Sequence, residues 1–176
     1  MKAITREEGL IQIYDKIKDI KFAMLTSVGE DGLLRSRPMS TTKAEFDGQL
    51  WFFTYDETEK TDEIDKQPEV NLAYADIANS TYVSVSGRAR IVHDKNKMEK
   101  LWNPMFRAWF PKGLEQPGIA LLVVNIEQAE FWDSSSSKMV QLFQMAKAIL
   151  TGSQANQGEH KEIKIVGPAK IEKQKK

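Results

Sequence analysis

The chain has 176 residues, in which 25 lysines and arginines balance 25 aspartates and glutamates, so no overall basic field recruits nucleic acid. It contains no cysteine, which excludes disulfides, thiol catalysis and cysteine-based zinc sites. The two histidines, His93 and His160, are far apart in the sequence, so we expect neither a histidine metal cluster nor a Ser-His-Asp triad. No apolar run approaches about 18 residues and the start lacks the apolar region of a signal peptide. We therefore expect a cytoplasmic protein with neither a membrane nor a nucleic-acid partner.

The first third of the chain predicts one helix followed by antiparallel strands. Residues 5–8 (TREE) have the capping-box pattern and apolar residues follow at helical spacing, which predicts an amphipathic helix over 5–20. Strand-like runs then cover 22–28, 33–46 and 49–55. Short glycine-containing turns separate these runs, and this arrangement is typical of hairpins.

The middle of the chain continues the same pattern. Residues 56–67 have helical composition and stop before Pro68, and strand-like runs follow at 70–76 and 80–94. Gly87 stands inside the second of these runs, which predicts a bulge or a sharp corner. Apolar residues from Met98 to Met105 indicate a second amphipathic helix.

The remaining segments complete a mainly β domain with flanking helices. After a loop at 109–118 we expect a fully buried strand at 119–126, a short strand at 129–133 and a serine-capped helix at 134–152. Mostly local strand order favours a small closed antiparallel barrel over a sandwich or a doubly wound sheet. We assign residues 1–152 to the domain and 153–176 to a polar C-terminal tail, with one candidate strand (EIKIVG) before a lysine-rich end.

Two arginines in one strand-like run raise the first question of function. Arg35 and Arg37 are two residues apart, so both side chains point to the same face of a strand, and Pro38 then removes a backbone donor. An exposed edge strand that resists aggregation is one explanation. A pair of guanidinium groups that binds phosphate is the other. The residues alone leave both open.

A second candidate anion site lies where a strand runs into a helix. The strand ends near Thr54, and Thr58 opens the helix with Lys60 in its first turn. Free amides at a helix start attract phosphate, and a hydroxyl and an ammonium add donors. An ordinary threonine N-cap is the competing explanation.

Aromatic and polar side chains give weaker signals. Four tryptophans could wall a flat heteroaromatic ligand or simply fill the core. The run STYVSVSG places Tyr82, Ser84 and Ser86 on one strand face, which points into a barrel mouth or into water. No general acid or base is evident, so any chemistry would come from a cofactor. The tryptophans are Trp51, Trp102, Trp109 and Trp132.

Taken in order, these motifs resemble the FMN-binding split barrels related to pyridoxamine 5′-phosphate oxidase. The resemblance rests on RSRPM (35–39), FFT (52–54), T-x-K (58–60), P-x-V-x-L-x-Y (68–74) and SVSG (84–87). The later stretches LWNPMFRAWFPKG and EFWD resemble more narrowly the general stress protein branch. The resemblance covers about residues 5–152. It implies a six-stranded antiparallel Greek-key split β-barrel that forms a homodimer, with FMN at the dimer interface.

The resemblance also implies roles for individual residues. Arg37, Thr58 and Lys60 would hold the FMN phosphate, and the backbone at Pro38 and Met39 would run beside the flavin ring. The other implied cofactor contacts are Phe53 and Thr54 at a strand end, Tyr82 where the oxidase has a glutamine, and Trp132, contributed by the partner chain.

Departures from the oxidase pattern narrow the expected function. Glu59 stands where the oxidase has a second basic residue, and the oxidase's C-terminal Arg-x-His ending is absent. We therefore do not expect pyridoxamine phosphate oxidation. We expect an FMN-binding flavoprotein of oxidoreductase type, with an unknown substrate or a reductant such as NAD(P)H. The alternatives are a non-catalytic flavin-binding or flavin-sensing stress protein, and a barrel that holds deazaflavin or haem.

Overall fold

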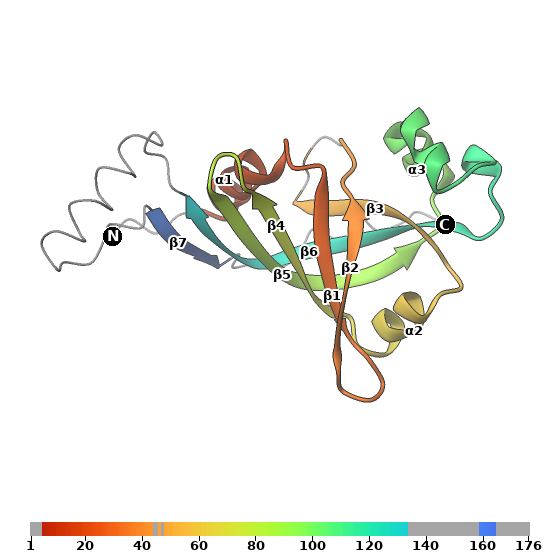
Figure 1. The fold of residues 1–176 in the computed structure, drawn as a ribbon, viewed down its shortest axis with the longest axis horizontal. Coiled ribbons are helices and arrows are strands. Elements are labelled where there is room, and N and C mark those ends of the chain that lie inside the picture. Colours follow the sequence, from red (N-terminus) through yellow and green to blue (C-terminus); the bar gives the residue numbers. More distant parts are fainter. Residues whose placement is uncertain (1–4, 44–45, 47, 134–158, 165–176) are drawn as a thin grey trace, which may run out of the picture.

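The computed structural model describes residues 5–43, 46, 48–133 and 159–164, which form one antiparallel sheet with three α-helices at its margins (Figure 1). The expected helix at 134–152 lies outside the described residues. The helices are α1 (Arg6–Ile17), α2 (Glu59–Lys66) and α3 (Lys95–Leu101). The strands are β1 (Phe22–Val28), β2 (Leu34–Ser40), β3 (Gln49–Tyr55), β4 (Glu69–Asp76), β5 (Thr81–Val92), β6 (Ile119–Asp133) and β7 (Glu159–Lys164).

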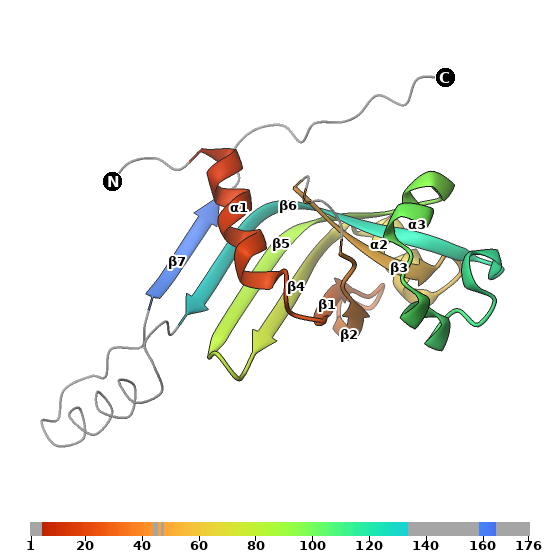
Figure 2. The same cartoon turned by 90° about the horizontal axis from the view of Figure 1, so that it is seen from above.

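The predicted split barrel is confirmed. The hydrogen-bonded order is β2-β1-β4-β5-β6-β3, with β7 added to β6, and the path from β2 to β3 is not closed by a ladder. Six strands thus form the curved sheet seen in Figure 2, and β7 extends it within the segment assigned to the tail. None of the helices in the described ranges has the length and apolarity of a bilayer-crossing segment.

The helix α1 begins where the sequence predicts it. Thr5 accepts a hydrogen bond from the amide of Glu8, and the Glu8 side chain accepts one from the Thr5 amide, so the capping box is complete. Lys16 pairs with Asp133 at the end of β6, and Lys161 of β7 donates to Gln12 at 2.6 Å. These contacts fix α1 against the sheet beside β7.

One long strand replaces the two strands expected at 119–126 and 129–133. The polar pair at 127–128 looked like an interruption, but β6 continues through it to Asp133. The register against β5 shifts here, because Gly87 pairs with Ile126 whereas Ser86 pairs with Gln128. The extra residue, Glu127, forms a bulge. On the other edge of β6, β3 pairs with the half before the bulge and β7 with the half after it.

The glycine in β5 is required by close packing. A Cβ built on Gly87 would lie 2.1 Å from the Asn125 carbonyl oxygen, a distance that no side chain can occupy. The bulge predicted from Gly87 is therefore confirmed, and its cause is the close approach of the β6 backbone.

Two hydrophobic clusters lie on the two faces of the first half of β6. Leu122 and Val124 belong to a cluster with α1, α2 and the inner faces of β1, β4 and β5, whereas Leu121 and Val123 pack with Trp51, α3 and the following 3₁₀ helix. Since both faces are buried, this half-strand has no polar alternation, which explains the apolar run.

The strand-like run at 33–46 is longer in the sequence than in the structure. The strand β2 ends at Ser40, where the chain turns back toward the end of α1. Thr41 donates from its amide to the Lys21 carbonyl and from its hydroxyl to the Ile20 carbonyl, at 3.0 and 2.9 Å. These bonds fix the end of the strand.

Candidate anion-binding site

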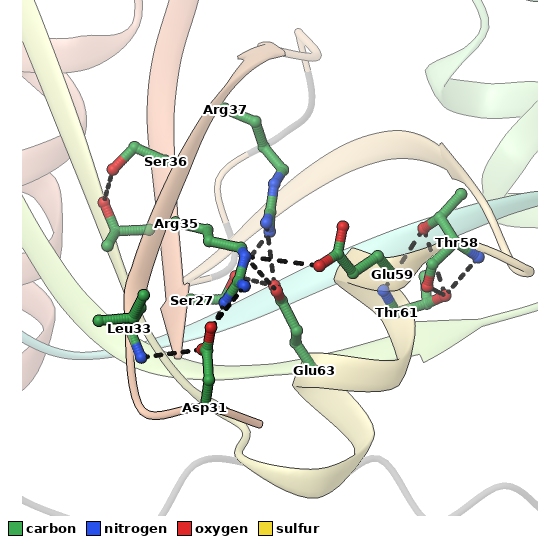
Figure 3. Close-up of polar contacts among 11 residues, drawn as sticks. Ser27, Asp31, Leu33, Arg35, Ser36, Arg37, Thr58, Glu59, Thr61 and Glu63 are labelled. Carbon is green, nitrogen blue, oxygen red and sulfur yellow. Dashed lines mark hydrogen bonds and ion pairs between the residues drawn. The ribbon is translucent and has the colours of Figure 1, made fainter. Parts of the chain in front are cut away.

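Arg35 and Arg37 lie on one face of β2, and this face turns toward α2 (Figure 3). The shared face was predicted from the two-residue period of a strand. Met39 follows on the same face and is buried in the core, whereas Pro38 is exposed on the opposite face. The hairpin that carries β2 is closed by the predicted turn, with Gly32 at a φ of 76°.

Arg37 is held by groups from two other elements. Its Nη1 donates to the Ser27 hydroxyl of β1 at 2.6 Å, and its Nη2 donates to Oε2 of Glu63 on α2 at 2.9 Å. Ser27 in turn donates to the same Glu63 oxygen at 2.5 Å. The guanidinium orientation is therefore fixed by the fold.

Glu63 is a buried carboxylate whose charge is stabilised by its neighbours. Its side chain is 3% exposed, and burial by itself raises the pKa of a carboxyl group. The hydrogen bonds from Ser27 and Arg37, with the charges of Arg37 and Arg35, outweigh that burial and leave the pKa of Glu63 below its ordinary value. Glu63 is therefore ionised at neutral pH. Its Oε1 is buried and has no hydrogen-bond donor.

Arg35 pairs mainly with Asp31, in the turn between β1 and β2. It forms two hydrogen bonds with the Asp31 carboxylate, at 2.8 and 2.9 Å, and these hydrogen bonds lower the pKa of Asp31 to about 2. Its Nε also lies 3.4 Å from Glu59 and 3.8 Å from Glu63. Arg35 and Arg37 thus share Glu63 but otherwise have different partners.

The start of α2 is capped and carries Lys60 between acidic residues. Thr58 and Thr61 form a reciprocal capping box, and the Thr58 carbonyl accepts the amides of Thr61 and Asp62. The amides of Glu59 and Lys60 are therefore the first-turn donors without an acceptor in the helix. Burial, and then the nearby charge of Arg37, lower the pKa of Lys60 to about 8. Two cations from separate elements are close enough to oppose each other's charge, and a bound anion would relieve that repulsion.

The other predicted cofactor residues are placed elsewhere. Phe53 and Thr54 are buried, and the Phe53 ring packs against Trp102, Phe106 and Phe110 in the second cluster. These interactions are those of core residues. Any contact of this strand end with a ligand would therefore involve its backbone rather than these side chains.

Tyr82 and Trp132 lie on the outer face of the sheet, opposite the side that carries Arg37. They are directly paired across β5 and β6 and are 45% and 41% exposed. On β7, His160 stacks on Trp132 with ring centroids 5.0 Å apart and lies 3.6 Å from Glu130. The end of β6 and the start of β5 lie beside β7, at the opposite end of the sheet from α2 (Figures 1 and 2).

Two site residues, Ser27 and Glu63, were missed by the sequence analysis, and the position of His160 beside Trp132 was also missed. The hairpin register, which pairs Ser27 with Arg35 and Leu25 with Arg37, could have placed Ser27 beside the arginines. Glu63 gave no signal, because a buried glutamate in a charge-rich helix has the same composition as an exposed one. His160 could not be placed, because the pairing of β7 is a long-range contact. Across the described ranges there is no group of three histidine, aspartate or glutamate side chains that could hold a metal ion.

Fold and site together define an antiparallel split-barrel protein with paired arginines and carboxylates, and Lys60, in the corner between an edge strand and a helix start. The family model described as "Pyridoxamine 5'-phosphate oxidase like" matches residues 8–156. The chain belongs to this family, as its motifs predicted.

The general stress protein branch is also confirmed by the relatives. The chain is 29% identical over 153 residues to Protein bli-3 of Neurospora crassa, covering 81% of this chain and 73% of that protein. It is 26% identical over 92 residues to General stress protein 26 of Bacillus subtilis, covering 51% of this chain and 65% of that protein.

Solved structures agree with the fold. A putative general stress protein 26 from Jannaschia sp. CCS1 superposes with a TM-score of 0.69 at 23% identity, covering 88% of this chain and 96% of that one. The general stress FMN/FAD binding protein from Xanthomonas citri superposes with a TM-score of 0.63 at 28% identity, covering 74% and 92%.

Proposed function

We propose that this protein binds FMN through a phosphate site formed by Arg37, Thr58 and Lys60, and that it acts as a dimeric flavoprotein of oxidoreductase type. The observation that carries the proposal is that Arg37 of β2 is held against α2 through Glu63, on the helix whose first turn carries Thr58 and Lys60. A flavin-binding relative, the Xanthomonas citri protein, supports flavin as the ligand.

The donor set suits a phosphate group. Arg37 uses one hydrogen each of Nη1 and Nη2 within the protein, and a guanidinium has five N–H donors. The remaining donors, the Lys60 ammonium and the first-turn amides provide charge and hydrogen bonds of the kind that hold phosphate at a helix start. An anion at this point would also raise the pKa of Lys60, because it favours the charged form.

The residues expected to contact FMN lie on two opposite faces of the sheet, and this arrangement favours a homodimer. Arg37 pairs with Glu63 on the α2 side of the sheet, whereas Tyr82 and Trp132 lie on the outer face, on ends of β5 and β6 that Figure 2 shows far from α2. A flavin bound near Arg37 could meet a tryptophan at this position only from a second copy. The outer face also exposes Phe22 (49%) and Met24 (42%), large apolar side chains that an interface would cover.

The flavin would supply hydride transfer, while the residues of this chain position it and provide electrostatics. The described ionisable groups around the phosphate corner are mostly paired with each other, and Asp56 lies 3.0 Å from His93. Apart from Lys60, which the proposal assigns to the phosphate, these paired groups are not placed as free acids or bases. This observation favours a second candidate, a flavin-binding or flavin-sensing stress protein without turnover. Stopped-flow mixing with NADH or NADPH separates the two, since flavin bleaching followed by reoxidation requires turnover.

The binding test measures the affinities of wild type and two arginine variants for FMN and for riboflavin. Arg37→Ala should weaken FMN binding at least about tenfold, because a charge-assisted contact contributes roughly 1.5–3 kcal/mol. Riboflavin, which lacks the phosphate, should bind both proteins equally. Arg88→Ala is the matched control, since Arg88 is an exposed arginine paired with Glu69 at 2.9 Å on another part of the sheet. Equal FMN affinity in Arg37→Ala and wild type, measured by flavin fluorescence, would reject Arg37 as the phosphate ligand.

A further inference from the structure

We propose that Glu63 sets the charge selectivity of the phosphate site, so that the site favours a singly charged phosphate over a dianion. The inference rests on the proposed function, since it concerns the same corner between β2 and α2. It assigns a role to a residue that belongs to none of the motifs that resemble the flavoprotein family.

Glu63 already occupies the position of an anion beside Arg37. Its Oε2 accepts hydrogen bonds from the guanidinium at 2.9 Å and from Ser27 at 2.5 Å. The side chain is 3% exposed on a helix that packs into the core through the neighbouring Ile64. A carboxylate buried in this way cannot move into solvent when a ligand arrives, so its charge remains near the phosphate.

Both arginines of the corner are paired with carboxylates before any ligand binds. Arg35 is engaged by Asp31 and lies near Glu59, and Arg37 is engaged by Glu63. Lys60 is the cation of the corner for which the described residues show no ion pair. The cations are Arg35, Arg37 and Lys60, and the carboxylates are Asp31, Glu59 and Glu63.

One unpaired cation matches one negative charge. A singly charged phosphate meets Lys60 and the free donors of Arg37, so its one charge lies beside the cation that no carboxylate of the described residues pairs. The second charge of a phosphate dianion has no cation left and lies close to the Glu63 carboxylate in a partly buried site, where like charges repel most strongly. Glu63 therefore lowers the affinity for the dianion more than the affinity for the monoanion.

The experiment measures the affinity of wild type and Glu63→Gln for three ligands near pH 7.5, where a phosphate monoester is mainly dianionic. The ligands are riboflavin, FMN and the FMN monomethyl ester, which carries one phosphate charge. Glutamine has the shape of glutamate and still accepts hydrogen bonds from Arg37 and Ser27, but it has no charge. We expect the ratio of ester to FMN dissociation constants to rise at least about tenfold in Glu63→Gln, while riboflavin affinity stays unchanged.

Glu69→Gln is the matched control, because Glu69 also pairs with an arginine at 2.9 Å but is exposed and lies at the start of β4. Its ratio should equal that of wild type. An unchanged ratio in Glu63→Gln, or equal rises in both variants, overturns the inference.

Wild type alone provides a second test, which does not depend on the folding of a variant. It should bind the monomethyl ester at least as tightly as FMN, and FMN binding about tenfold tighter than the ester overturns the inference. If wild type binds none of the three ligands, the proposed function itself is wrong, and this result differs from flavin binding without charge selectivity.

Discussion

The corner between β2 and α2 and the outer face of the sheet differ in how their side chains are satisfied. In the corner, each arginine contacts carboxylates from its own chain, and Ser27 connects Arg37 to Glu63. On the outer face, apolar side chains such as Met24 and Trp132 remain more than two-fifths exposed. The arginines of the corner are therefore paired within one chain, whereas the outer face has the composition of a surface that a partner covers.

The largest effect should come from a charge on the outer face. Met24→Asp introduces a carboxylate beside Pro38 and Ala73, its cross-strand neighbours. If this face is the homodimer interface, burial of an unpaired charge should weaken association at least about a hundredfold. Sedimentation equilibrium measures this directly.

Ile77→Asp provides the control for charge alone. Ile77 is 79% exposed at the end of β4, so its substitution should leave the fold intact. Equal weakening in both variants would show that any added charge has this effect. A monomeric wild type would show that the outer face needs another explanation.

Much of the difference between the corner and the outer face could be predicted from the sequence. The bounds of β1 and β3 agree with the runs at 22–28 and 49–55, because glycine turns and apolar β-formers coincide there. Strand periodicity placed both arginines on one face. The same periodicity put Tyr82 and Ser84 on one face of β5, and the structure leaves Tyr82 exposed and buries Val83 and Val85 on the opposite face.

What the sequence could not provide were long-range pairings and the burial of charge. The two halves of β6 are joined by a bulge that depends on Gly87 lying against Asn125. This contact is long-range, so the polar pair at 127–128 was interpreted as a break between two strands. The contact of Glu63 on α2 with Arg37 on β2 joins residues 26 positions apart. Core packing of Phe53 likewise depends on a helical segment some 50 residues later.

A medium effect is expected from the least satisfied charge of the corner. Lys60→Met should raise the free energy of unfolding at pH 7 by about 1–2 kcal/mol, because it removes a cation that is partly buried beside Arg37. The pKa of Lys60 is about 8 in the folded protein and higher when unfolded, so the unfolded chain binds more protons between these values. The stability of wild type should therefore rise with pH above about 8 through this residue.

Urea unfolding at pH 7 and pH 9.5 tests this prediction. The difference between Lys60→Met and wild type should shrink at the higher pH, where the lysine loses its charge. Lys66→Met is the control, since Lys66 is exposed and pairs with Glu30. Equal pH dependence of the Lys60→Met and Lys66→Met effects would contradict the burial of the Lys60 charge.

The smallest effect concerns Thr58, for which N-capping and phosphate binding are both open. Thr58 Oγ1 accepts the Thr61 amide at 3.4 Å, a long bond, and the Thr58 carbonyl accepts the same amide at 2.9 Å. Thr58→Ala should therefore cost only about 0.5 kcal/mol, the low end for a cap, and Thr58→Ser should cost less. If the hydroxyl also binds phosphate, Thr58→Ala should weaken FMN binding several-fold without changing riboflavin binding. Thr58→Ser should retain both affinities. A loss of stability in Thr58→Ala with unchanged FMN affinity would make Thr58 a cap alone, and phosphate binding would then depend on Arg37, Lys60 and the backbone of α2.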